Sequence, residues 1–329
     1  MSEGQAPDIS AYIGHEDAWA QWHRALAGSR MHHGWILAGR RGLGKSAFAL
    51  AAARELVAEP GVPQPPGEHP DILYVTHPPK NDAEARKRDD GKPYEVARNI
   101  RIDQIRQLQR RLTTRPTMGS RRAVIIDPAD DMEAPTANAL LKSLEEPPVG
   151  TFFLLVAHRL GRLLPTIRSR CRVLSFPRVS ESDMRAILAR EEPNADPAVQ
   201  EAAIAAAAGS PGVAIDFVKL DLGKVHRVMK EIAEHGDPDF TARGRLVEAM
   251  GTRPSREKQL AAIELARAVV AARMVGVTPA AIPALAETHA GLVQLGAQAP
   301  TYNFDPSLLA MEIGTLLASL AASREAAHG

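Results

Sequence analysis

Short apolar runs alternate with segments of helical spacing through the first half of the chain. The runs Trp35–Ala38, Ala123–Ile126 and Phe152–Ala157 are typical of buried strands, and so is the stretch that ends at Val75. The Ala-rich segment from Ser46 to Glu59 predicts a helix after the first run. Strands that alternate with helices favour a parallel sheet covered by helices, so we predict an α/β domain over residues 1–178.

Helical signals alone fill the second half. The segments Glu181 to Arg190 and Pro197 to Ala208 are bounded by capping residues. The last third is rich in Ala, Leu and Met at helical spacing, for example from Gln259 to Ala272. We predict a small helical domain over residues 179–219 and an all-helical domain over residues 220–329. Periodicity alone also fits a single core helix bundle within one chain.

One charged segment interrupts the α/β pattern. Residues 80–92, KNDAEARKRDDGK, carry nine acidic or basic side chains together with no apolar periodicity. A segment that offers no apolar face gains little by packing on a core. We therefore predict that residues 80–92 form a mobile loop.

A complete phosphate-binding loop follows the first apolar run. The sequence from Gly39 to Ser46, GRRGLGKS, fits the pattern G-x-x-x-x-G-K-S/T, and it has a predicted strand before it and a predicted helix after it. Gly39, Gly42 and Gly44 let the backbone wrap closely around a phosphate, whose charge the helix N-terminus attracts. Lys45 is expected to reach the phosphates of ATP or ADP, and the Ser46 hydroxyl is expected to bind Mg²⁺.

A second strand supplies the acid that such a site needs. Asp127 directly follows the apolar run Ala123–Ile126 and is the predicted second magnesium residue. The next residue is Pro128, which has no group that could accept a proton from water. Asp130 and Asp131 come after this proline-constrained bend, so we expect both carboxylates to point elsewhere.

Three segments further along the chain carry a family resemblance. They are residues 136–148, TANALLKSLEEPP; the strand Phe152–Ala157; and residues 163–171, LLPTIRSRC. This run resembles the clamp-loader ATPase family of AAA+ proteins, whose signature is N-A-L-L-K-x-L-E-E-P-P followed by T-I-x-S-R-C. The combination is highly specific. The resemblance covers the first half of the chain and fades in the last third.

The departures from the family pattern point to a non-hydrolysing subunit. The resemblance implies that a catalytic Glu, a sensor Thr and a lid-domain Arg are replaced here by Pro128, Ala157 and Gly212. It further implies a collar-forming C-terminal domain and a hetero-pentamer with ATPase (gamma/tau) and delta subunits. That complex places a sliding clamp on primed DNA within a DNA polymerase III holoenzyme. The chain itself is then not expected to be a catalyst.

The resemblance also implies a role for Arg170. In the family, the arginine of the Ser-Arg-Cys motif reaches across a subunit boundary to the γ-phosphate of ATP in the neighbouring subunit. A guanidinium suits this role because it is always charged and presents a planar fork of donors. We therefore predict that Arg170 acts in trans as an arginine finger. Its neighbour Cys171 is expected to be a buried, inert thiol.

The sequence predicts no zinc site. Many members of the family carry a four-cysteine zinc module after the first helix, whereas this chain has a Pro/Gly-rich stretch there and Cys171 as its only cysteine. His69 and His77 lie on either side of a predicted strand. Two histidines without further ligands make a poor metal site, so we expect both to be solvated loop residues.

Composition agrees with a cytoplasmic protein. The chain has 329 residues, a net charge of +1, no apolar run of membrane-spanning length and no signal-peptide pattern at its start. Residues 151–178 contain six arginines and no acid, which indicates either a DNA path or an interface facing an acidic neighbour. We favour the interface because no aromatic residue lies between the arginines from Arg159 to Arg172. Two other classes stay open: an active clamp-loader ATPase subunit, and an AAA+ ATP-binding protein outside replication.

Overall fold

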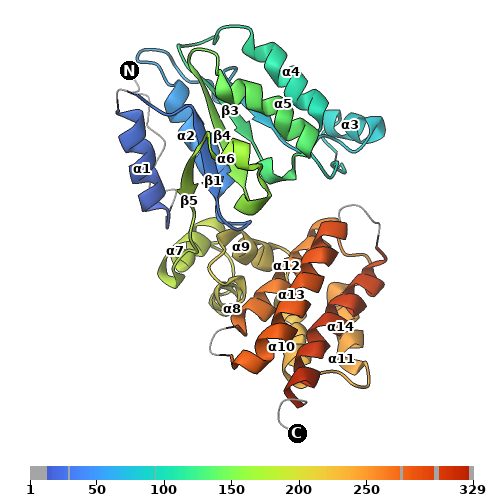
Figure 1. Cartoon of the computed structure of the whole chain (residues 1–329). Helices are drawn as coiled ribbons and strands as arrows, with labels where there is room; N and C mark the ends of the chain where they lie inside the picture. Colours follow the sequence, from blue (N-terminus) through green and yellow to red (C-terminus); the bar gives the residue numbers. More distant parts are fainter. Residues whose placement is uncertain (1–12, 29, 93, 275–276, 300–303, 326–329) are drawn as a thin grey trace. The chain divides into compact units, whose positions relative to one another are not determined.

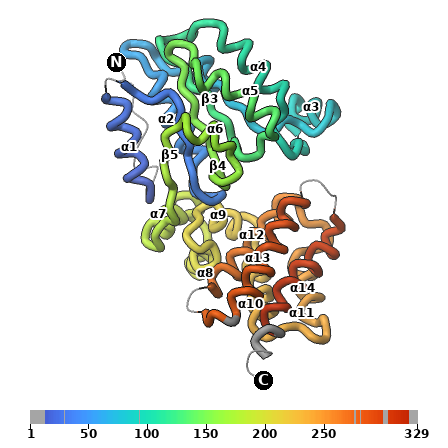
Figure 2. The backbone as a smooth tube through the Cα atoms, viewed as in Figure 1, coloured from blue at the N-terminus to red at the C-terminus, as the bar shows by residue number. Residues whose placement is uncertain are grey.

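The chain divides into two compact units between Pro177 and Arg178 (Figures 1 and 2). This computed structural model describes residues 13–325 apart from 29, 93, 275–276 and 300–303. Among the described residues, no helix combines the length and apolar character required to cross a membrane. Each unit is described by itself below.

Five parallel strands form the sheet of the first unit, in the spatial order β2-β3-β4-β1-β5. Their bounds are β1 Gly34–Ala38, β2 Ile72–Val75, β3 Arg122–Ile126, β4 Thr151–Ala157 and β5 Arg172–Ser175. β1 and β3 are buried along their whole length, which explains their continuous apolar sequences. The predicted parallel α/β sheet is confirmed. Because every strand runs the same way, their carboxyl ends meet at one edge.

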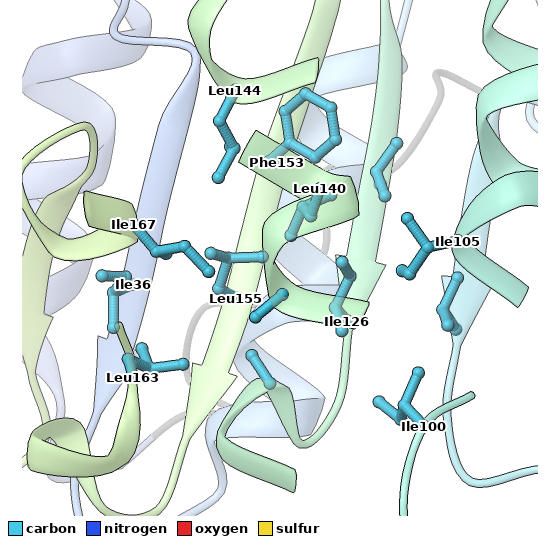
Figure 3. Close-up of a cluster of buried hydrophobic side chains, with 14 of the residues drawn as sticks. Ile36, Ile100, Ile105, Ile126, Leu140, Leu144, Phe153, Leu155, Leu163 and Ile167 are labelled. Carbon is cyan, nitrogen blue, oxygen red and sulfur yellow. The ribbon is translucent and has the colours of Figure 1, made fainter. Parts of the chain in front are cut away.

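Helices cover both faces of this sheet. Helices α4 (Ile102–Leu112), α5 (Ala134–Glu145) and α6 (Pro165–Arg168) pack on one face, and α1 (Glu16–Leu26) and α2 (Lys45–Val57) lie on the other. Figure 3 shows the core on the first face, where Ile36 and Leu155 of the strands meet Leu140 of α5. On the second face, Trp35 of β1 packs edge-on to Trp22 of α1, with ring centroids 5.6 Å apart.

The charged segment 80–92 is not a loop as predicted, because helix α3 (Asp82–Asp89) forms within it. Asn81 caps this helix by accepting a hydrogen bond from the backbone N–H of Glu84 at 3.0 Å. The Glu84 carboxylate in turn accepts hydrogen bonds from Lys87 and from the backbone N–H of Glu95, both at 2.7 Å. Capping and charge pairs thus stabilise a helix that has no apolar stripe, which is why periodicity missed it.

The second unit is entirely helical, as the sequence predicts. Its helices are α7 Glu181–Glu191, α8 Pro197–Ala207, α9 Pro211–Lys219, α10 Gly223–His235, α11 Thr241–Met250, α12 Arg256–Ala272, α13 Ile282–Gln298 and α14 Pro306–Glu325. Single 3-10 turns occupy Ala129–Asp131 and Leu160–Arg162 in the first unit and Pro279–Ala281 in the second. Helix α12 contacts both α8 and α9. A division of this unit into domains 179–219 and 220–329 stays a prediction.

Candidate functional site

The phosphate-binding loop connects β1 to α2 at the carboxyl edge of the sheet. Gly39 has no space for a side chain, because a Cβ there would lie 2.5 Å from the backbone oxygen of Phe176. Gly44 is the N-cap of α2 and has φ 75°, and Gly42 has φ 80°; both values favour glycine. The backbone therefore has the tight course that the sequence predicts for a phosphate cradle.

Lys45 lies at the centre of this cradle. Its side chain is buried, and its Nζ donates a hydrogen bond to the backbone oxygen of Arg40 at 2.6 Å. Burial lowers the pKa of Lys45 to about 8, while the carboxylates of Asp127 and Asp130 act in the opposite direction. A cation held beside the first turn of a helix is suited to bind phosphate, so the loop residues fit a nucleoside phosphate.

One of the two predicted magnesium residues, Asp127, is bonded to Tyr74, which the sequence analysis did not single out. The Tyr74 hydroxyl donates to Asp127 Oδ2 at 2.6 Å. Burial and the nearby Asp127 carboxylate raise the pKa of Tyr74. An aromatic hydroxyl in an otherwise apolar strand was the available signal, but the contact spans 53 residues of sequence.

The hydrolytic side of the site lacks the groups that the family pattern would supply. Pro128 follows Asp127, and Ala157 ends β4 with only a methyl group. Next to it, the half-buried imidazole of His158 has its pKa lowered, mainly by burial and then by the charge of Lys45. Within the described part of the chain, His158 Nδ1 has no hydrogen-bond partner. Sequence reasoning gave His158 no role.

Asp130 and Asp131 are engaged by other groups, as expected. The buried Asp130 carboxylate accepts the backbone N–H groups of His158 and Arg159 at 2.8 and 3.0 Å. The Asp131 carboxylate lies 3.2 Å from His77 Nε2 and 3.5 Å from Arg162 Nη1. A carboxylate that accepts backbone N–H groups, or that lies beside other basic side chains, is poorly placed to take a proton from water.

Arg170 is not brought near the phosphate loop. The backbone oxygen of Arg170 lies 3.1 Å from where a Cβ on Gly34 would be, and Gly34 is the first residue of β1. The phosphate loop begins at the other end of β1, after Ala38. Five residues of strand separate Gly34 from Gly39, which corresponds to about 16 Å. The guanidinium is partly exposed; it pairs with Glu145 Oε1 at 2.7 Å and donates to the Thr166 backbone oxygen at 2.9 Å.

The arginine-rich segment 151–178 is partly neutralised by contacts within the chain. Arg159 and Arg162 lie beside Asp131, and the guanidinium of Arg172 lies 5.9 Å from the ring centroid of Trp35. Cys171 is half-buried, and burial raises the pKa of its thiol to about 12. This environment agrees with the predicted inert thiol.

The prediction that His69 and His77 are solvated is wrong. His69 is buried and accepts a hydrogen bond at Nδ1 from the backbone N–H of Asp71 at 3.0 Å. His77 Nε2 is shielded from solvent and lies 3.2 Å from the Asp131 carboxylate. Both histidines are thus held by local structure. In the described ranges, no group of three or more potential ligand side chains could hold a metal ion.

The sheet order, the loop after β1 and the acid after β3 define a P-loop α/β protein of the AAA+ type. Residues 14–180, slightly more than half of the chain, match the family described as "DNA polymerase III, delta subunit". The chain belongs to this family, and its resemblance to clamp-loader proteins is confirmed.

Curated relatives carry names from the same complex. The chain is 35% identical over 206 residues to "DNA polymerase III subunit delta'" of Pseudomonas aeruginosa, which covers 59% of this chain and 57% of that protein. It is 30% identical over 227 residues to the delta' subunit of Escherichia coli, covering 62% of each chain. It is also 32% identical over 204 residues to "DNA polymerase III subunit gamma/tau" of Mycobacterium tuberculosis, covering 60% of this chain and 34% of that one. The matches span about a third to two thirds of these relatives.

Solved structures resemble the chain at lower identity. A gamma subunit-related protein of DNA polymerase III from Thermotoga maritima is 18% identical with a TM-score of 0.48, covering 92% of this chain and 99% of that one. The RuvB Holliday junction branch migration motor of the same organism is 18% identical with a TM-score of 0.49, covering 92% and 89%.

Proposed function

We propose that this chain is a non-hydrolysing delta' subunit that acts as a stator in a DNA polymerase III clamp loader. It would assemble with ATPase (gamma/tau) and delta subunits in a cytoplasmic hetero-pentamer that loads a sliding clamp onto primed DNA. One observation carries the proposal: the phosphate-binding half of the P-loop site is intact, while Pro128 and Ala157 leave its hydrolytic half without a proton acceptor or sensor. The delta' names of its relatives support the same assignment.

Nucleotide binding is the first testable part of this function. Gly39, Gly42, Gly44 and Lys45 fit the phosphates of ATP or ADP, and Ser46 and Asp127 are the residues that would hold Mg²⁺, which screens phosphate charge when bound. The purified chain should bind a fluorescent ADP analogue and release no phosphate from ATP above background. Turnover that disappears in Lys45→Ala would instead support the active ATPase subunit, the second candidate, which the gamma/tau relative also favours.

The arginine-finger role of Arg170 is the second part. Arg170 lies about 16 Å along the sheet from the chain's own phosphate loop, so the γ-phosphate that it could contact belongs to another subunit. Its guanidinium is partly exposed and lies at the end of α6, where the Thr166 oxygen and Glu145 fix its direction. Such a donor would offset the negative charge that develops on γ-phosphate oxygens in the transition state.

Assembly is tested by reconstitution. The chain should co-elute in gel filtration with gamma/tau and delta subunits, and omission of the chain should abolish clamp loading. If the chain does not assemble with these subunits, the replication role fails. In that case the general AAA+ ATP-binding protein outside replication becomes the better account.

A further inference from the structure

The Tyr74 hydroxyl engages one of the two residues that would hold Mg²⁺. It donates a hydrogen bond to Asp127 Oδ2 at 2.6 Å. A Mg²⁺ site needs oxygen ligands, or the waters they hold, in a nearly fixed octahedral arrangement. A carboxylate oxygen that already accepts from a phenol must give up that hydrogen bond before it can serve a metal ion.

Tyr74 is anchored on β2, the outer strand next to β3. Its neighbour Val75 accepts the backbone N–H of Asp127 at 2.9 Å, so the strand pairing fixes the height of the phenol relative to that carboxylate. The side chain as a whole is 47% exposed. The ring is therefore held at its hydroxyl end but is free enough to be displaced, which makes Tyr74 a competitor of the metal rather than a permanent block.

The phosphate residues do not depend on this metal pair. Lys45 donates a hydrogen bond to the Arg40 backbone oxygen, and the shape of the glycine loop is set by its own backbone conformation. We propose that Tyr74 competes with Mg²⁺ for Asp127, so that this chain binds a nucleoside diphosphate or triphosphate with little dependence on Mg²⁺. The proposal rests on the nucleotide binding proposed above and adds the residue that sets its metal requirement.

The test compares nucleotide affinity with and without Mg²⁺. Titrations of a fluorescent ADP analogue are made in Mg²⁺ and in EDTA with the wild-type chain, Tyr74→Phe, and Tyr94→Phe as the matched control on an exposed tyrosine. We expect the wild type and Tyr94→Phe to change affinity less than about twofold between the two media, and Tyr74→Phe to bind about tenfold more tightly in Mg²⁺ only. Tyr74→Leu, which also lacks the hydroxyl, should behave like Tyr74→Phe, and thermal melts check that both fold.

Each outcome decides the proposal. A wild-type chain that already needs Mg²⁺, with Tyr74→Phe unchanged from it, overturns the inference and leaves nucleotide binding intact. Wild-type affinity that is equal in the two media, together with tighter binding by Tyr74→Phe in Mg²⁺ only, supports the inference, whereas binding by Tyr74→Phe alone overturns it. If neither chain binds in either medium, the inference is overturned together with the proposed nucleotide binding. Lys45→Ala should weaken binding of the analogue in both media, which would confirm that the analogue binds at this loop.

Discussion

The two ends of the sheet in the first unit use their charged groups in opposite ways. At the carboxyl edge, Lys45, Asp127 and Tyr74 bond to groups of the same loop and its neighbouring strands, and Lys45 is buried. At the amino edge, Arg170 keeps part of its guanidinium in solvent, and its carboxylate partner Glu145 is 47% exposed.

We interpret this difference as a division of roles, with ligand binding at the carboxyl edge and action on a partner subunit at the amino edge. In the proposed function, the buried groups at the carboxyl edge hold a nucleotide, and Pro128 and Ala157 leave them without the residues that would cleave it. A partly exposed cation with free donors is available to a partner molecule. The predictions below test whether the carboxyl edge only binds and whether the amino edge acts on another subunit, in order of decreasing expected effect.

Arg170→Ala should produce the largest effect, and only in the assembled complex. Arginine fingers contribute about 10³ to 10⁵ in rate at the site they face, so ATP hydrolysis at that site should nearly stop. The other sites of the ring should continue to hydrolyse ATP, so the loss of total turnover should be partial. Arg170→Lys should not rescue it, because an ammonium lacks the two-pronged geometry. The measurement is DNA- and clamp-stimulated ATP hydrolysis by reconstituted loaders, with assembly checked by gel filtration.

Arg168→Ala is the control, since Arg168 is an exposed arginine two residues before Arg170, at the end of α6. The isolated chain should keep its fold and nucleotide affinity in both variants. Normal hydrolysis and clamp loading by Arg170→Ala complexes would reduce Arg170 to an interface residue. The contrast between the two edges would then lose its functional meaning.

Cys171 should resist alkylation although it follows Arg170 directly. Burial raises its pKa to about 12, so at pH 8 the folded chain should react with iodoacetamide at least about a hundredfold more slowly than free cysteine. Because it is the only cysteine, mass spectrometry reports this site alone, and unfolding in guanidinium should restore the normal rate. Rapid reaction of the folded chain would mean that the whole Ser-Arg-Cys turn is open to solvent, not the arginine alone.

Lys45→Ala should weaken nucleotide binding by the isolated chain at least about tenfold, because it removes the buried cation of the phosphate cradle. Phosphate release should be at background in both chains. Equilibrium titration with the fluorescent ADP analogue measures the first effect, and Lys224→Ala, on an exposed lysine of α10, provides the control. Equal affinity in Lys45→Ala and wild type would show that the carboxyl edge does not hold nucleotide.

Apolar runs and the P-loop pattern were enough to predict the parallel sheet, the helical second half and the tight glycine turn after β1, because these depend on local sequence. Helix α3 escaped because the Asn81 cap and the Glu84 contacts stabilise it without an apolar stripe. Tyr74 and His158 escaped for a different reason. Their relation to Asp127 and Lys45 is created by strands that lie far apart in the chain, and no spacing rule reports it.

Glu145→Gln should have the smallest effect and refine the account of the amino edge. Glu145 accepts from Arg170 Nη2 at 2.7 Å while Nη1 donates to the Thr166 oxygen, so the carboxylate fixes the second prong of the fork. Exposed ion pairs contribute about 0–1 kcal/mol, so the melting temperature should hardly change. Because a guanidinium held in one direction loses less freedom on meeting phosphate, we expect hydrolysis at the site that Arg170 faces to fall a few-fold, and total loader ATPase to fall by less than in Arg170→Ala. Glu146→Gln is the matched control, since it makes the same charge change on the adjacent residue and Arg170 pairs with Glu145 in the described structure. A rise in ATPase for Glu145→Gln would mean that Glu145 restrains Arg170 instead of orienting it.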